Sequence, residues 1–365
     1  MSIPINIYAE ELEEDVLHQF AKAINEPYVM KAALMPDAHY GYTLPIGAAV
    51  ATRDMILPSW VGVDIGCGMA AVCTDFKLHE IVKHRDKIFH SIYRGVPVGR
   101  DHNSKASEWT SPVEFSNVIK KLMKSRKGLL QLGSLGGGNH FIEIGYDEQS
   151  RIWFIVHSGS RGVGHGCATH YMALASNSDR KIEGNYGFEP DSINGKSYIM
   201  DLEFCLQYAL ANRLLMLHKV EREVAYYCSG SCDFDNLINR NHNHAEYRDS
   251  LWIHRKGCTH AELGMLGVIP GNMKDGSYIV EGLGNPDSLY SSSHGAGRRI
   301  GRGQAKDTLS LETFVQQMEG ITARVDKRTL DEGPSAYKDI HEVMDLQKDL
   351  VKILHLVRPL INIKG

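Results

Sequence analysis

Glycine-rich turns recur from residue 36 to residue 302, and they alternate with short apolar runs of the kind that form strands. The 35 glycines and 18 histidines of the chain gather in these same few segments. Because glycine permits tight turns, such a pattern favours short strands and loops mixed with helices over a bundle of long helices. No linker, internal repeat or change of composition interrupts it, so we expect one α+β domain spanning residues 1–365.

The apolar periodicity predicts where helices and strands lie along the chain. Helical patterns occupy four stretches: 8–24, 113–130, 203–228 and 310–356. A proline-bearing break lies inside the last of them. Short apolar runs typical of strands lie within residues 45–74 and at residues 141–146, 151–157 and 277–284. The chemistry-bearing residues therefore fall mainly at strand ends and in the turns between strands.

Composition and charge exclude several classes of protein. The chain is 43% hydrophobic and 23% charged, which is typical of a folded globular protein. No stretch approaches the roughly 18 consecutive apolar residues of a membrane-spanning helix. The N-terminal segment turns acidic where a signal peptide would be apolar, so we expect a cytoplasmic protein with reduced cysteines. A net charge of −4 argues against a generally basic nucleic-acid-binding surface but permits a local basic groove.

Five residues have the chemistry of metal ligands. Asp64 and Cys67 lie in VGVDIGCGM, where three glycines allow the backbone to bring both side chains to one point. His140 follows a glycine turn, His157 ends an apolar run and His242 lies in RNHNHAE. Mixed nitrogen, oxygen and sulfur donors suit Mn, Zn, Fe or Co, whereas the spacing does not match a zinc finger. The alternative is a buried cysteine beside a turn aspartate, with unrelated histidines.

His294 lies in a second segment whose residue types could take part in a reaction, SSSHGAGRRIGRGQAK. Arginines and a lysine follow it without an intervening acidic residue, at Arg298, Arg299, Arg302 and Lys306. A glycine turn with free N–H groups beside arginines is suited to phosphate, and a histidine there could act as a nucleophile or a general acid. A basic surface loop is the alternative. No Walker A motif or clear dinucleotide fingerprint is present, so a nucleotide would be bound in another way.

Eleven ordered motifs resemble the RtcB-type RNA ligases, from about residue 35 to the end of the chain. They are MPDAHYGYTLPIG, VGVDIGCGM, LGGGNHFIEI, VHSGSRGVG, the HN of NHNHAE, HRKG, IPGNM, SYIVEGLGNP, SSHGAGR, DEGPSAYKDI and the terminal IKG. This resemblance implies a single large α+β domain in which mixed and antiparallel sheets surround a central dinuclear metal site. It also implies GTP-dependent joining of RNA 3′-phosphate or 2′,3′-cyclic phosphate ends to 5′-hydroxyl ends.

The same resemblance assigns roles to individual residues. The two Mn²⁺ ions would be bound by Asp64, Cys67, His140, His157 and His242. His294 would be the nucleophile that becomes covalently linked to GMP. The guanylate would be bound by Asn139, His140, Phe141, Ile142, Glu143, His242, Asn243, Pro270, Gly271, Asn272, Met273, Ser277, His294, Gly295, Ala296, Gly297, Tyr337 and Lys364.

The expected partner is a broken tRNA or ribosomal RNA, with an accessory repair factor possible and neither DNA nor a membrane expected. Basic residues that could bind RNA phosphates are Arg161, Arg255, Arg298, Arg302 and the cluster at 120–127. Two other functions stay open: a metal-dependent RNA phosphatase or cyclic phosphodiesterase without ligation, and a non-catalytic RNA-binding protein. Departures from the family pattern, which bear on RNA specificity, occur at Thr43, Cys258, Asn272, Gly301 and Gly333.

Overall fold

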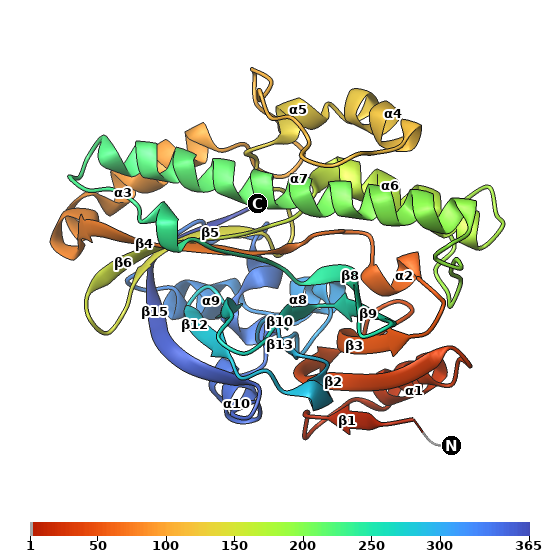
Figure 1. The fold of residues 1–365 in the computed structure, drawn as a ribbon. Helices are drawn as coiled ribbons and strands as arrows, with labels where there is room; N and C mark the ends of the chain where they lie inside the picture. Colours follow the sequence, from red (N-terminus) through yellow and green to blue (C-terminus); the bar gives the residue numbers. More distant parts are fainter. Residues whose placement is uncertain (1–2) are drawn as a thin grey trace.

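Two β-sheets lie beneath a layer of helices in the computed structural model, which describes residues 3–365 (Figure 1). Within those residues the larger sheet has the order β11-β12-β15-β5-β6-β4-β7, with the short β14 paired to β15. Its strands are β4 (Gly68–Lys77), β5 (Phe141–Tyr146), β6 (Arg151–Ser158), β7 (Ile238–Asn241), β11 (Leu266–Pro270), β12 (Ser277–Gly282), β14 (Thr322–Ala323) and β15 (Val351–Lys364).

The second sheet has the order β1-β2-β3-β9-β8, and a two-stranded ribbon pairs β10 with β13. These strands are β1 (Ile5–Ile7), β2 (Val29–His39), β3 (Ile46–Thr52), β8 (Asn243–Arg248), β9 (Leu251–Lys256), β10 (Cys258–His260) and β13 (Ser291–Ser293). The β1–β2 and β14–β15 pairs are parallel, and the other named strand pairs are antiparallel. The predicted α+β fold with mixed and antiparallel sheets is therefore confirmed.

Helices α3, α6 and α7 form the layer above the larger sheet, and α4 and α5 lie beyond them (Figure 1). The α-helices are α1 (Glu14–Ile24), α2 (Pro58–Val61), α3 (Leu78–Gly95), α4 (Asn117–Ser125), α5 (Gly128–Gln131), α6 (Arg161–Ala175), α7 (Ile193–Ala225), α8 (Arg302–Thr308), α9 (Leu311–Gln317) and α10 (Ile340–Asp345). Short 3-10 helices are η1 (Phe234–Asn236), η2 (Pro286–Ser288), η3 (Leu330–Glu332) and η4 (Pro334–Ala336). Within residues 3–365, no helix combines the length and the apolar character needed to cross a membrane.

Apolar side chains of α3 and α7 bury one face of the larger sheet. Val220 of α7 and Ile88 of α3 pack in the same cluster as Ile144 of β5, Phe154 of β6 and Ile361 of β15. Each of these five side chains is fully buried. Alternate residues of a strand face opposite sides of the sheet. The residues next to Ile144, Phe154 and Ile361 in their strands therefore face the other side, where the candidate site lies.

The structure corrects the sequence prediction at the C-terminal end of the chain. The predicted helices end with α10, and residues 351–364 form the long strand β15 instead. This strand pairs with β12 along its first half and with β5 along its second half. Hydrogen bonding to two neighbouring strands outweighs the local helical pattern at 351–356. Helices α3 and α6 and strand β2 were not predicted, whereas β5, β6 and β12 form where strands were expected.

Arg213, on the buried face of α7, joins this helix to the turn before β4, the end of β6 and strand β7. Its guanidinium donates hydrogen bonds to the Gly66 carbonyl at 2.8 Å, the Ser158 carbonyl at 2.9 Å, and the Asn239 and Asn241 side-chain oxygens at 2.7 Å each. The side chain is fully buried, and burial lowers its pKa to about 10, so it stays charged at neutral pH. A single buried cation therefore satisfies four acceptors from separate segments.

Replacing Arg213 with methionine should destabilise the fold strongly. The variant Arg213→Met leaves the two buried carbonyls of Gly66 and Ser158, and two partly buried asparagine oxygens, without this donor. Each buried acceptor left unpaired costs about 1–3 kcal/mol. We expect the free energy of unfolding in urea to fall by about 3 kcal/mol or more. The control Arg222→Met, on the same helix but exposed and paired with its neighbour Glu223, should change it by about 0.5 kcal/mol at most. Equal effects of the two substitutions would contradict this role for Arg213.

Candidate active site

Antiparallel pairing in the larger sheet brings four candidate ligand positions to one end of its strands. Cys67 directly precedes β4, His140 precedes β5, and His157 lies at the end of β6. In the register, Phe141 lies opposite His157, and Gly68 lies opposite both Ser158 and Asn241. His242 follows β7 directly, and its backbone N–H donates to the Cys67 carbonyl at 2.7 Å. Segments that are far apart in the sequence are therefore held side by side.

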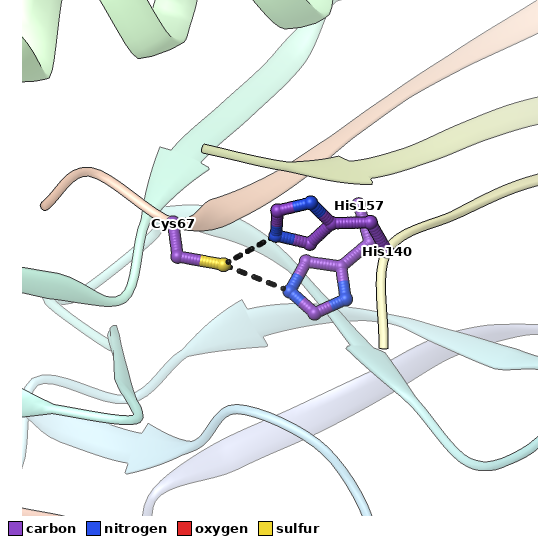
Figure 2. A group of neighbouring side chains, drawn as sticks. All are labelled: Cys67, His140 and His157. Atoms are coloured by element: carbon purple, nitrogen blue, oxygen red, sulfur yellow. Dashed lines mark hydrogen bonds between the residues drawn. The ribbon is translucent and has the colours of Figure 1, made fainter. Parts of the chain in front are cut away.

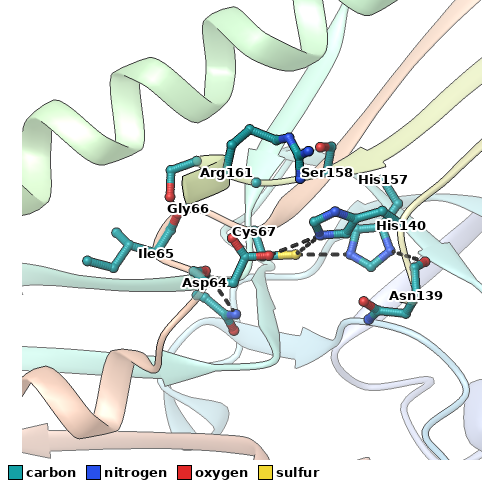
Figure 3. Close-up of polar contacts among 12 residues, drawn as sticks. Asp64, Ile65, Gly66, Cys67, Asn139, His140, His157, Ser158 and Arg161 are labelled. Carbon is teal, nitrogen blue, oxygen red and sulfur yellow. Dashed lines mark hydrogen bonds and ion pairs between the residues drawn. The ribbon is translucent and has the colours of Figure 1, made fainter. Parts of the chain in front are cut away.

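The donor atoms of the five predicted metal ligands form a continuous chain. Asp64 Oδ2 lies 3.0 Å from His140 Nε2. The same nitrogen lies 3.4 Å from Cys67 Sγ (Figure 2). The same sulfur lies 3.2 Å from His157 Nε2, which in turn lies 3.3 Å from His242 Nε2. Figure 3 shows Asp64, Cys67 and the two histidines gathered below Arg161, at the start of α6. The thiol occupies the middle of the chain, with two donors on either side.

Backbone carbonyls fix the orientation of two of the imidazoles. His140 Nδ1 donates to the Leu135 carbonyl at 3.0 Å, and His157 Nδ1 donates to the Asn139 carbonyl at 3.2 Å. Because a carbonyl only accepts, each Nδ1 carries the proton and each Nε2 presents a lone pair to the cluster. Burial lowers the pKa of His157 and of His242 far below the usual range, so both are neutral and able to bind a cation.

The surroundings of Cys67 and Asp64 also fit a bound cation. Burial and the neighbouring Asp64 carboxylate raise the pKa of the Cys67 thiol well above its usual value. A divalent ion would reverse this by stabilising the thiolate, and a thiolate can bridge two such ions. Space around Asp64 is restricted, since a Cβ on Gly159 would lie 2.3 Å from Asp64 Oδ1. The donor set of thiol, carboxylate and neutral imidazoles therefore suits a transition ion such as Mn²⁺.

His294 lies at the edge of this cluster and is oriented by the buried carboxylate of Asp37. Its Nδ1 lies 2.7 Å from Asp37 Oδ2, which also accepts from the His294 and Gly295 backbone N–H groups at 3.1 and 3.2 Å. Asp37 is fully buried; burial raises its pKa, but the contact with His294 outweighs this and the pKa lies below its usual value. The carboxylate therefore holds the proton on His294 Nδ1 and leaves Nε2 as the lone-pair atom. The His294 ring meets that of His242 edge-on, with centroids 4.9 Å apart.

Two residues of this arrangement were missed by the sequence analysis, although both lie in the quoted motif MPDAHYGYTLPIG. Asp37 orients His294, and His39 packs nearly parallel to the His294 ring with centroids 6.3 Å apart. His39 Nδ1 donates to the Asp37 carbonyl at 2.9 Å. Asp37 thus positions both imidazoles, one through its side chain and one through its backbone. The signal that could have identified them is the spacing of Asp37 and His39, a carboxylate and a histidine two residues apart.

A cavity beside His294 is lined by most residues predicted to bind guanylate. Those that line it are Asn139, Phe141, Pro270, Gly271, Asn272, Met273, His294, Gly295, Ala296, Gly297, Tyr337 and Lys364. His140, His242 and Asn243 lie on the metal-ligand side, where Asn243 Nδ2 donates to the Asp64 carbonyl at 3.2 Å. Ile142 points into the core on the opposite face of β5, so its side chain does not reach the cavity.

Charged groups under the cavity form a buried network. Glu332 accepts from Lys364 Nζ at 2.8 Å and from the Tyr337 hydroxyl at 2.6 Å, and burial together with the Glu332 charge raises the pKa of Tyr337. Glu143 accepts from Ser277 Oγ at 3.1 Å, and burial raises its pKa to about 7. Lysine, tyrosine and carboxyl groups are thus available to recognise a polar ligand. Ser277 and Glu143 lie just behind the residues that line the cavity.

The residues predicted to bind RNA phosphates fall into different environments. Arg298 and Arg302 line the cavity, with Glu332 as a partner at 3.3 and 2.5 Å. Arg161 lies next to Asp64 and donates to the Gly99 carbonyl at 2.7 Å. Arg255 contradicts the prediction because it is fully buried in the central part of its sheet. Its guanidinium donates to Glu246, Ser291 and the Leu289 carbonyl, so it is a structural residue.

Two departures from the expected family pattern have a simple structural reading. Asn272 closes its turn, since its side-chain oxygen accepts from the Lys274 and Asp275 backbone N–H groups at 2.9 and 3.1 Å. Gly301 begins α8 in open space, with no heavy atom within 4 Å of an added Cβ. Neither difference disturbs the Cys67 cluster or His294.

Comparison with known proteins agrees with this geometry. The family described as "tRNA-splicing ligase RtcB" matches residues 19–126 and 119–365. The RNA-splicing ligase RtcB of Escherichia coli K12 is 32% identical, over 97% of this chain and 95% of that protein. The tRNA-splicing ligase RtcB of Nanoarchaeum equitans is 28% identical, over 100% of this chain and 96% of that protein. The chain therefore belongs to the RtcB family.

Proposed function

We propose that this chain is an RNA ligase that joins 3′-phosphate or 2′,3′-cyclic phosphate ends to 5′-hydroxyl ends with GTP and Mn²⁺. Membership of the RtcB family supports ligase activity on RNA. The observation that carries the finer proposal is His294, whose Nδ1 is held by Asp37 while Nε2 is left as a lone-pair atom beside a cavity. A hydrolase needs no such nucleophile, because water can attack the phosphate directly.

In the first step the Nε2 lone pair of His294 attacks the α-phosphorus of GTP. A P–N bond forms while the bond from that phosphorus to the bridging oxygen breaks, and pyrophosphate leaves. The proton on Nδ1 stays in place, so the guanylylated ring carries a positive charge that the Asp37 carboxylate stabilises at 2.7 Å. Asp37 therefore both sets the reactive tautomer and stabilises the product of this step.

In the later steps an oxygen of the RNA 3′-phosphate attacks the same phosphorus, and the P–N bond breaks. The 5′-hydroxyl oxygen of the second strand then attacks the activated 3′-phosphate; its proton is released and GMP leaves. A cyclic phosphate must first be opened by water. Two Mn²⁺ ions, bound by Asp64, Cys67, His140, His157 and His242, would neutralise phosphate charge and polarise phosphoryl oxygens when present.

The order of the donor atoms is compatible with two ions. Cys67 Sγ lies between a pair of donors from Asp64 and His140 and a pair from His157 and His242. A thiolate in that position can bind one ion on each side. The cavity beside His294 would bind the guanylate. Candidate contacts include Phe141, Tyr337 and Lys364, with Glu143 and Ser277 behind them. A broken tRNA or rRNA as substrate, an accessory repair factor and a cytoplasmic location belong to the same proposal.

Incubation with GTP and Mn²⁺ should add the mass of one GMP to the protein. The adduct should be lost in acid, because a P–N bond to imidazole is acid-labile, and His294→Ala should not form it. The control His341→Ala, outside the cavity, should retain it. Intact mass spectrometry measures all three. A wild-type protein that binds Mn²⁺ but gains no mass would exclude the ligase and favour a metal-dependent phosphatase or cyclic phosphodiesterase.

The substitution Asp37→Asn should slow formation of the GMP adduct while leaving the fold intact. Asp37 Oδ2 also accepts from the His294 and Gly295 backbone N–H groups, so the amide oxygen of asparagine would take this place and keep the hydrogen bond to Nδ1. The negative charge that stabilises the guanylylated ring would be lost, and we expect the rate to fall by about 100-fold. Quench-flow or timed mass spectrometry gives the rate, and circular dichroism checks the fold. An unchanged rate would show that the charge of Asp37 does not assist this step.

Metal binding should depend on the Cys67 cluster. We expect the wild-type protein to retain two Mn²⁺ per chain in equilibrium dialysis, and Cys67→Ala to lose most of both because the central donor is gone. Cys73→Ala is a matched control, since Cys73 lies further along β4 and outside the cluster. If Cys67→Ala bound as much Mn²⁺ as Cys73→Ala, the proposed site would be wrong.

A further inference from the structure

A second cavity lies beside the C-terminal end of α3, outside the site described above. Its wall is formed by seven residues: Tyr93, Arg94, Pro97, Val98, Arg100, Asp101 and His102. We call this cavity the α3 groove. Arg94 and Arg100 are exposed, and within residues 3–365 neither forms an ion pair with a carboxylate. Two cations whose charge is not balanced by a direct partner thus face one cavity.

Further cations border the α3 groove. Lys127 donates to His102 Nε2 at 3.0 Å, so its ammonium is held at the rim. This lysine ends the basic run at 120–127 that the sequence analysis singled out. The guanidinium of Arg324 packs over the ring of Tyr93, a residue of the groove wall, at 4.3 Å from the ring centroid. Asp101 is the acidic residue in the wall, so positive charge predominates.

The segment that lines the α3 groove contacts the candidate active site through Gly99, which lies between Val98 and Arg100 of the groove wall. The Gly99 backbone N–H donates to the Gly136 carbonyl at 2.7 Å, and the Gly99 carbonyl accepts from Arg161 at 2.7 Å. Gly136 in turn lies against His140, since a Cβ there would be 2.5 Å from His140 Nδ1. A segment of only a few residues therefore connects the groove wall to the ligand cluster.

We propose that the α3 groove binds the backbone phosphates of single-stranded RNA next to the broken end. This inference rests on the proposed function, because an RNA end at the Cys67 cluster must continue across a neighbouring surface. Arginine is suited to that role, since its planar guanidinium makes paired hydrogen bonds to a phosphate. The contacts would be independent of base sequence and sensitive to salt.

The test compares two double variants of equal charge. Arg94→Gln/Arg100→Gln removes the two groove arginines, and Arg53→Gln/Arg180→Gln removes two exposed arginines elsewhere that also lack a carboxylate partner. Fluorescence anisotropy measures binding of a short labelled RNA with a 3′-phosphate, at several salt concentrations and without GTP. We expect the groove variant to raise Kd about tenfold and to reduce the slope of log Kd against log salt by about 0.7 per lost contact. The control should match wild type.

Formation of the GMP adduct without RNA provides an independent readout. It should be unchanged in the groove variant, because neither arginine lines the guanylate cavity. Equal RNA affinity and equal salt slope in the two double variants would overturn the groove proposal even if guanylylation is normal. Absence of the adduct in wild type would instead overturn the proposed function. Competition by inorganic phosphate as effective as that by RNA would show a site for free phosphate, and would also contradict the proposal.

Discussion

The hydrogen bonds of Arg213 hold together the loops from which the site is built. One guanidinium contacts Gly66 beside Cys67, Ser158 beside His157, and Asn241 beside His242. Each contact lies one residue away from a candidate ligand, so the position of α7 sets the spacing of the donor atoms. The preceding residue, Asn212, adds hydrogen bonds to Ser134 and Gly159. The long helix is therefore the support on which the cluster depends, and its burial keeps that support rigid.

A positive charge at this point also has an electrostatic consequence. Arg213 lowers the pKa of Cys67, opposing the larger effect of burial and of Asp64. Because the buried histidines are neutral, they do not repel a metal cation, and their lone pairs are free to bind it. Asp37 has the opposite charge, and its buried carboxylate faces His294, which lies 257 residues further along the chain. The site thus has two electrostatic regions: the Cys67 cluster, which attracts cations, and the Asp37–His294 pair, in which a carboxylate stabilises positive charge on an imidazole. The two regions adjoin, since the rings of His242 and His294 pack edge-on.

Local sequence predicted the ligand cluster because its residues stand beside glycine turns and strand ends, which antiparallel pairing brings together. It could not reveal Arg213, whose helix has an ordinary apolar pattern and whose partners are two backbone carbonyls and two asparagine side chains far away in sequence. Arg255 was misread for the converse reason, since a buried arginine and an exposed one look the same in sequence. The strand β15 was missed at 351–356 because its pairing partners there lie 69 to 78 residues away. Tertiary context, rather than residue chemistry, was the missing information.

The two cavities reach the cluster through different residues. The cavity beside His294 includes His157 in its wall, whereas the α3 groove connects through Gly99, Gly136 and Arg161 to the side of His140. A nucleotide and an RNA strand could therefore occupy the protein together without competing for the same side chains. The proposed reaction would need this separation, because the activated RNA end would have to stay bound while GMP is still attached. Arg94 and Arg100 belong to one cavity and Arg298 and Arg302 to the other, so substitutions in the α3 groove would leave the surroundings of His294 unchanged.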